Sequence, residues 1–122
     1  MKQIDYEIGQ IIETLRSTGQ LDNTVIVIST DHADYLGDHG LIGKASFYEA
    51  AMKIPLLVRP PRNPAASASN ELVELRDVTA TMLRFAGCEL PDYMDSQPLP
   101  ELGLGGPPPR ERIFGMLTDG WM

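Results

Sequence analysis

Residues 25–32 read Val-Ile-Val-Ile-Ser-Thr-Asp-His, so four β-branched apolar residues run directly into a polar segment. A strand with one solvent-exposed face alternates apolar and polar residues, whereas a continuous β-branched run is typical of a strand buried on both faces of a parallel sheet. We therefore predict a buried strand at residues 25–28. Asp31 and His32 follow at its carboxyl end, the edge at which open α/β sheets bind their ligands.

A helix and a second strand are predicted on either side of this run. Apolar residues recur at helical spacing from Ile4 to Leu15, and Gly19 is expected to end the helix. Residues 55–58, Pro-Leu-Leu-Val, are followed by two prolines and predict another strand. Residues 31–48 lie between the strands as a long, polar, glycine-rich loop, which its length predicts to be functional.

The second half of the chain has weaker signals. Residues 63–70 are small and polar and predict a surface linker, whereas residues 77–85 have the apolar spacing of a helix that ends at Gly87. Residues 91–109 are dense in proline and glycine and predict a loop, and residues 112–117 predict a last strand.

The fold class that these elements predict is α/β, because a helix, a short turn and a buried strand make half of a βαβ unit. A strand buried on both faces needs further strands beside it and helices above and below it. The chain supplies too few elements for this, so we expect an incomplete fold with a sheet edge and an apolar face exposed.

Composition excludes several classes of partner. The net charge of -7 argues against nucleic acid and against anionic membranes, which both require a basic surface. No apolar run approaches the roughly 20 residues that a membrane span needs. Cys88 is the only cysteine, so neither an intrachain disulfide nor a cysteine-rich zinc site can form. An acidic protein can still bind an anion locally where a metal ion and a lysine dominate the field.

Three side chains in the 31–48 loop are candidates for chemistry. Asp31 and His32 offer a carboxylate and an imidazole as two metal ligands, and the remaining ligands would have to come from elsewhere. On spacing alone, a turn-capping Asp31 and an ordinary loop His32 are the more common case. Lys44 follows Gly43 and could hold an oxyanion as a point charge, or could be a solvated surface lysine.

A family resemblance favours the chemical interpretation. Residues 30–44 read TDHADYLGDHGLIGK, and Phe47-Tyr48-Glu49 and residues 54–59, IPLLVR, follow. This order is similar to the second signature region of the sulfatase family, approximately Ser/Thr-Asp-His-Gly-Asp, Leu-Gly-Glu-His, a Lys, Tyr-Glu and a Val-Pro-Leu strand. Weaker similarity extends over the preceding helix and residues 73–87, so it covers most of the chain and fades after about Pro91.

The resemblance implies roles for four residues. Asp31 and His32 would be two of the four protein ligands of a divalent metal ion, with calcium favoured by hard oxygen ligands and manganese as the alternative. Lys44 would contact the sulfate or phosphonate oxygens of the substrate, and His39 is counted with it as catalytic because it lies at a family-like step near the site.

The resemblance also implies what the chain lacks. The nucleophile of the family is a formylglycine made from a Cys/Ser-x-Pro/Ala-x-Arg motif, which lies upstream together with two paired aspartates. Neither is present here, and Cys88 lacks the arginine of that motif and is interpreted as a packing cysteine at a helix end. Ala33 replaces the usual glycine, which would cost about 1 kcal/mol if the position needs a positive φ.

The implied fold is part of a sulfatase or alkaline-phosphatase-like sandwich, with a mixed, mostly parallel sheet flanked by helices, incomplete in this chain. Residues 1–62 would be the second half of the catalytic core, and residues 63–122 a linker, a helix and the start of a C-terminal subdomain.

The predicted function is that of a C-terminal fragment of a metal-dependent sulfuric ester hydrolase, inactive alone. Its partners would be a small-molecule or carbohydrate sulfate ester and the missing N-terminal half of the same domain. The alternatives are a phosphonate or phosphate monoester hydrolase of the same superfamily, and a non-catalytic truncated module.

Overall fold

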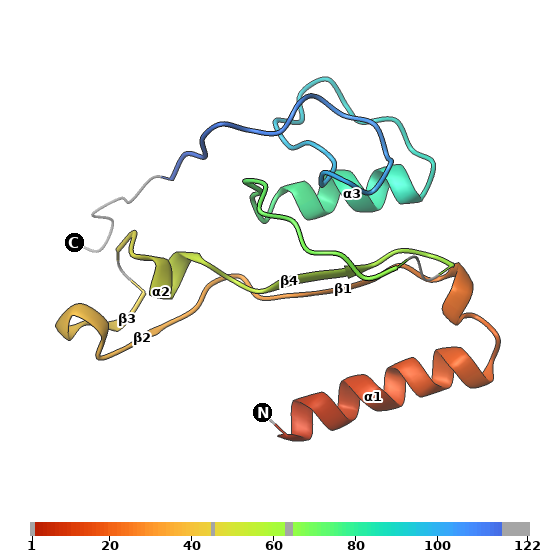
Figure 1. Ribbon diagram of the computed structural model, residues 1–122, viewed down its shortest axis with the longest axis horizontal. Helices are drawn as coiled ribbons and strands as arrows, with labels where there is room; N and C mark the ends of the chain where they lie inside the picture. The colour runs from red at the N-terminus through yellow and green to blue at the C-terminus, as the bar shows by residue number, and fades with distance from the viewer. Residues whose placement is uncertain (1, 45, 63–64, 116–122) are drawn as a thin grey trace. The chain divides into compact units, whose positions relative to one another are not determined.

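The computed structural model describes residues 2–44, 46–62 and 65–115. The elements follow one another as α1 (Lys2–Ser17), η1 (Leu21–Asn23), β1 (Ile26–Ser29), β2 (Tyr35–Leu36), η2 (Asp38–Gly40), β3 (Ile42–Gly43), α2 (Glu49–Met52), β4 (Leu56–Arg59) and α3 (Asp77–Phe85) (Figure 1). They form two compact units: unit 1 is Met1–Ile28 with Leu57–Ser67, and unit 2 is Ser29–Leu56 with Ala68–Met122. The division of the chain after residue 62 stays a prediction.

Helix α1 of unit 1 has the predicted extent. Ile8, Ile12 and Leu15 recur at helical spacing and are its half-buried side chains. Gly19 ends the helix with a φ of 70°, a conformation that glycine adopts without a Cβ penalty. The N–H of Gln20 then donates to the carbonyl of Leu15 at 2.8 Å, which satisfies a carbonyl at the helix end.

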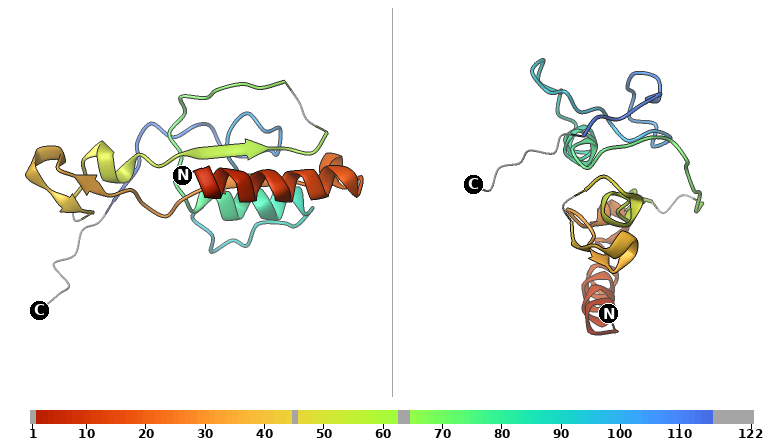
Figure 2. Two further views of the ribbon diagram at one scale, coloured as in Figure 1. Left: turned by 90° about the horizontal axis from the view of Figure 1, so that it is seen from below. Right: turned by 90° about the vertical axis from the view of Figure 1, so that its left-hand side faces the viewer.

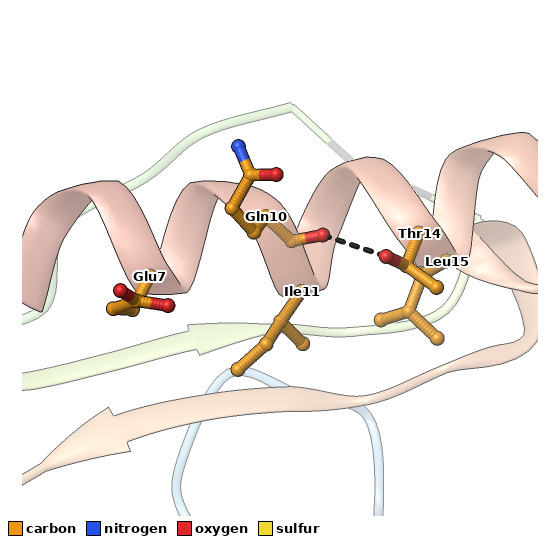
Figure 3. Close-up of a pocket in the computed structure, with 5 residues that line it drawn as sticks. All are labelled: Glu7, Gln10, Ile11, Thr14 and Leu15. Carbon is orange, nitrogen blue, oxygen red and sulfur yellow. Dashed lines mark hydrogen bonds between the residues drawn. The ribbon is translucent and has the colours of Figure 1, made fainter.

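Strands β1 and β4 pair in a two-stranded sheet, and the left view of Figure 2 shows α1 running roughly parallel to β4. Each strand lies one residue C-terminal to its predicted position, within the usual uncertainty of element ends. Figure 3 shows their arrowheads pointing in opposite directions, so this pair is antiparallel, as a mixed sheet allows. Residues 26–28 are half-buried rather than buried as predicted, because full burial of a strand requires packed layers on both faces of its sheet.

Some apolar side chains of α1 remain exposed to solvent. Ile4 and Ile11 are exposed by 64% and 62%. A shallow hollow on this helix is lined by Glu7, Gln10, Ile11, Thr14 and Leu15, all from α1 itself (Figure 3). This is the exposed apolar face that an incomplete α/β fold predicts.

Unit 2 contains the buried side chains of α3. Asp77, Ala80 and Thr81 are fully buried, and the hydroxyl of Thr81 accepts a hydrogen bond from the N–H of Leu99 at 2.8 Å. The helix ends as predicted: Gly87 has a φ of 75°, and the N–H of the following residue, Cys88, donates to a carbonyl of the last turn.

Two predictions for the second half are wrong. Cys88 is exposed, so it is not a packing cysteine, because the helix end on which it lies faces solvent. Residues 112–115 form no strand, because a strand needs a partner and the pairing in this region is a single bridge between Leu72 and Arg110. Residues 116 and 117 of the predicted strand lie outside the described residues.

Candidate metal and anion site

The carboxyl end of β1 positions the predicted metal pair. The Asp31 side chain is 77% exposed, and its Oδ2 lies 3.3 Å from Nε2 of His32. The hydroxyl of Thr30 lies 3.2 Å from the carbonyl of His32, and the N–H of Ala33 donates to the carbonyl of Ala51 at 3.0 Å. Ala51 is a buried residue of α2, so backbone contacts hold this segment on both sides.

The partners of His32 determine which ring nitrogen carries the proton. Nδ1 lies 3.2 Å from the carbonyl of Ala33 and 3.6 Å from Oδ1 of Asp34, and both of these oxygens can only accept. Nε2 contacts the ammonium group of Lys44, which can only donate. The contacts with Ala33, Asp34 and Lys44 therefore favour the proton on Nδ1 and the lone pair on Nε2, whereas Oδ2 of Asp31, 3.3 Å from Nε2, favours the opposite tautomer.

Asp31 is charged at neutral pH. Its own backbone N–H hydrogen-bonds the carboxylate and lowers its pKa below the usual value, while desolvation acts in the opposite direction. The backbone N–H of His32 and the hydroxyl of Thr30 lower the pKa further. An ionised carboxylate is the form that binds a metal ion.

A small hairpin brings Lys44 to this pair. The predicted 31–48 loop contains strands β2 and β3, which pair antiparallel with Tyr35 opposite Gly43. Lys44 follows β3 directly, and its Nζ reaches His32, twelve residues earlier in the chain. The structure thus brings Asp31, His32 and Lys44 together, and backbone hydrogen bonds across the hairpin account for the juxtaposition.

Tyr35 is a residue of this region that sequence reasoning missed. Its side chain is 1% exposed. Its hydroxyl lies 2.7 Å from Oγ of Ser46, 3.1 Å from the backbone N of Tyr48 and 3.3 Å from the carbonyl of Tyr48. The sequence offered little signal, because Tyr35 is one of three aromatic residues between residues 31 and 48 and nothing local marks it as the buried one.

His39 is placed differently from the other candidates. It has a φ of 53° and a ψ of 23°, and its ring stacks on that of Tyr48 with 3.9 Å between centroids. Its catalytic role stays a prediction. Ala33 does not have a positive φ. Alanine in place of the usual glycine therefore carries no conformational free-energy penalty at this position.

The donors fit a divalent cation but do not complete its coordination. Asp31 offers a charged oxygen and His32 a free imidazole lone pair, 3.3 Å apart. Among the residues that the structure describes, no group of three or more His, Cys, Asp or Glu side chains could hold a metal ion.

In the same described ranges, no helix is long and apolar enough to cross a membrane.

Known proteins share this sequence region. The family model described as Sulfatase matches residues 1–88. An arylsulfatase from Clostridium perfringens is 33% identical over 103 residues, which cover 81% of this chain and 21% of the relative. An N-acetylglucosamine-6-O-sulfatase from Bacteroides thetaiotaomicron is 36% identical over 89 residues, which cover 72% of this chain and 16% of the relative.

A solved structure confirms the fold class. The phosphonate monoester hydrolase SpPMH from Silicibacter pomeroyi superimposes with a TM-score of 0.73 at 37% identity, covering 79% of this chain and 19% of that chain. The predicted alkaline-phosphatase-like α/β fold is thereby confirmed. The chain spans about a fifth of the length of these relatives. Since the family match covers most of its residues, including Asp31, His32 and Lys44, the chain belongs to the sulfatase family.

Proposed function

We propose that Asp31 and His32 bind a divalent metal ion, and Lys44 an anionic ester group, in a sulfatase-type hydrolase that acts on sulfuric esters. The convergence of Asp31 Oδ2, His32 Nε2 and Lys44 Nζ in one place carries this proposal. The metal ion would act as a Lewis acid that neutralises charge on the transferring group. Calcium is the favoured ion and manganese the alternative, because the pair combines a hard oxygen with an imidazole.

Lys44 would serve as the anion-binding group of the site. Its ammonium now contacts the lone pair of His32 Nε2, which is the lone pair a metal ion needs. Once Nε2 of His32 coordinates a metal ion, Lys44 can no longer donate to it. The positive charges of the metal ion and the ammonium then repel each other, which favours a position of Lys44 from which it binds an anionic oxygen. We also propose His39 as a contributor to catalysis, on the ground that non-glycine residues with a left-handed backbone are enriched at functional sites.

The remaining parts of the site would come from residues outside this chain. Two donors are fewer than a metal site requires, and the formylglycine nucleophile expected of the family has no counterpart motif here. We therefore expect no hydrolysis of an aryl sulfate by the pure chain. Metal-dependent turnover by this chain alone would contradict that part of the proposal.

Titration of the chain with Mn²⁺, followed through the electron paramagnetic resonance signal of the free ion, tests the metal pair. We expect weak binding that Asp31→Asn or His32→Ala weakens by about tenfold or more, because each removes one of two donors. Asp22→Asn is the matched control, since Asp22 is an exposed aspartate of unit 1. Equal Mn²⁺ affinity in all variants would refute the assignment.

A phosphonate monoester hydrolase is the second candidate, and the match to SpPMH is the observation that favours it. Sulfate and phosphonate esters are both tetrahedral anions, so Lys44 would serve either. For the sulfuric esters, the similarity to an N-acetylglucosamine-6-O-sulfatase supports a sulfated carbohydrate as substrate. Replacing the matching segment of SpPMH by this chain, and comparing rates on aryl sulfates and aryl phosphonates, would show which ester the segment favours. A non-catalytic module, the third alternative, predicts that the replacement abolishes both activities.

A further inference from the structure

We propose that Tyr35 is a positioning residue, whose buried hydroxyl holds Lys44 beside the Asp31–His32 pair. This inference rests on the proposed function of that pair. Tyr35 touches neither Asp31 nor His32 through any recorded hydrogen bond, so its effect would pass through the backbone that carries Lys44.

The hydroxyl of Tyr35 uses its full hydrogen-bonding capacity. The backbone N–H of Tyr48 can only donate, so the hydroxyl accepts from it at 3.1 Å. The carbonyl of Tyr48 can only accept, so the hydroxyl is the donor in their 3.3 Å contact. The 2.7 Å contact with Ser46 joins two hydroxyl groups, either of which can be the donor. One hydroxyl thus joins β2 to two positions that follow Lys44.

A short path leads from this hydroxyl to the site. The N–H of Ser46, whose side chain Tyr35 holds, donates to the carbonyl of Lys44 at 2.9 Å. On the other side, Tyr35 is paired with Gly43, the residue before Lys44. The backbone of Lys44 is therefore fixed by Gly43 on one side and by Ser46 on the other, and its Nζ contacts Nε2 of His32.

The Asp31–His32 segment has an anchor of its own. The N–H of Ala33 donates to the carbonyl of Ala51 at 3.0 Å, and the N–H of Ala51 in turn donates to the carbonyl of Tyr48, so the hydroxyl of Tyr35 reaches this anchor only through the first turn of α2. Phenylalanine at position 35 would fill the same buried volume and remove only the hydroxyl. Tyr35→Phe should therefore release Lys44 while leaving the metal pair in place, an outcome that a purely space-filling tyrosine would not produce.

Paramagnetic broadening of backbone amides by Mn²⁺ tests this in the whole chain. In the unaltered protein, Mn²⁺ should broaden the amides of residues 31–33 together with those of Lys44 and Ser46. In Tyr35→Phe, residues 31–33 should broaden as before, while the ordered population of Lys44 falls by about fivefold, as expected for a lost hydrogen bond. Tyr93→Phe is the matched control, because Tyr93 is 86% exposed and, among the residues that the structure describes, its hydroxyl has no hydrogen-bond partner.

The outcomes separate this inference from the proposed function. Equal broadening of Lys44 and Ser46 in Tyr35→Phe and in the unaltered protein would overturn the positioning role. A lack of selective broadening at residues 31–33 in the unaltered protein would overturn the proposed metal pair itself. If Tyr35→Phe changes the backbone amide chemical shifts of β2 and β3, the hairpin itself is disturbed. Ser46→Ala then tests the positioning role instead, since it removes only the hydrogen bond between Ser46 and Tyr35. Unchanged broadening of Lys44 in Ser46→Ala would refute the inference, and reduced broadening would support it.

Discussion

Replacement of Asp77 by alanine should destabilise unit 2 strongly. The Asp77 side chain is 1% exposed and forms an ion pair with Arg110, itself 15% exposed. Oδ1 accepts from Nη2 of Arg110 at 2.9 Å and from the N–H of Gln97 at 3.0 Å, and Oδ2 accepts from the N–H of Glu74 at 2.8 Å. Removing one member of a buried ion pair costs about 3–5 kcal/mol, because the other charge stays buried without its partner.

The lower part of that range is expected here. Oε2 of Glu74 lies 3.6 Å from Nη2 of Arg110 and would partly compensate the guanidinium. Two assays apply. Urea unfolding gives the free energy of unfolding of the chain, and amide hydrogen exchange in α3 gives the free energy of opening of that helix. Asp95→Ala is the control: its carboxylate is 88% exposed and 4.0 Å from Arg76, so it should cost less than about 1 kcal/mol. A loss for Asp77→Ala no larger than that for Asp95→Ala would refute the reasoning.

Three further predictions concern pH and backbone conformation. Burial raises the pKa of Asp77, but the hydrogen bonds from Arg110 and from backbone N–H groups outweigh it and lower the pKa overall. The stability that Asp77 provides should therefore be fully present above its unfolded pKa and fade as pH falls through the lower folded value, which urea unfolding at several acidic pH values would show. His39→Gly should be more stable to heat than His39→Ala by about 1 kcal/mol, because both lose the stacking on Tyr48 and only glycine accepts a φ of 53° without penalty. Gly87→Ala should cost about 1 kcal/mol in α3 stability, measured by hydrogen exchange, because the residue has a φ of 75° and no atom lies within 4 Å of an added Cβ.

Local signals explain which elements could be predicted from the sequence. The ends of α1 and α3 are determined within a few residues by glycines at positions 19 and 87, which adopt left-handed conformations. The β-branched run of β1 predicted a strand. Asp31 and His32 were assigned as a metal pair through the family resemblance, because on spacing alone ordinary loop residues are the more common case. Lys44 was located through the family resemblance rather than through spacing, because a single lysine in a loop is most often solvated.

Long-range pairings explain what was missed. The role of Tyr35 depends on the register that places it opposite Gly43 and on the turn that returns Ser46 to its hydroxyl. The pair of Asp77 and Arg110 joins residues 33 positions apart through a segment rich in proline and glycine, for which no periodic pattern exists. The exposure of Cys88 likewise depends on what covers the end of α3, which composition does not reveal.

The most direct test of the metal and anion site is hydrolysis by a chimera. The segment of the Clostridium perfringens arylsulfatase that matches this chain would be replaced by it, with and without Asp31→Asn, and aryl sulfate turnover would be measured with added divalent metal. The site described here predicts turnover by the parent chimera and a loss of about 100-fold or more on Asp31→Asn, since a metal ligand is removed. An Asp31→Asn chimera as active as its parent would contradict it.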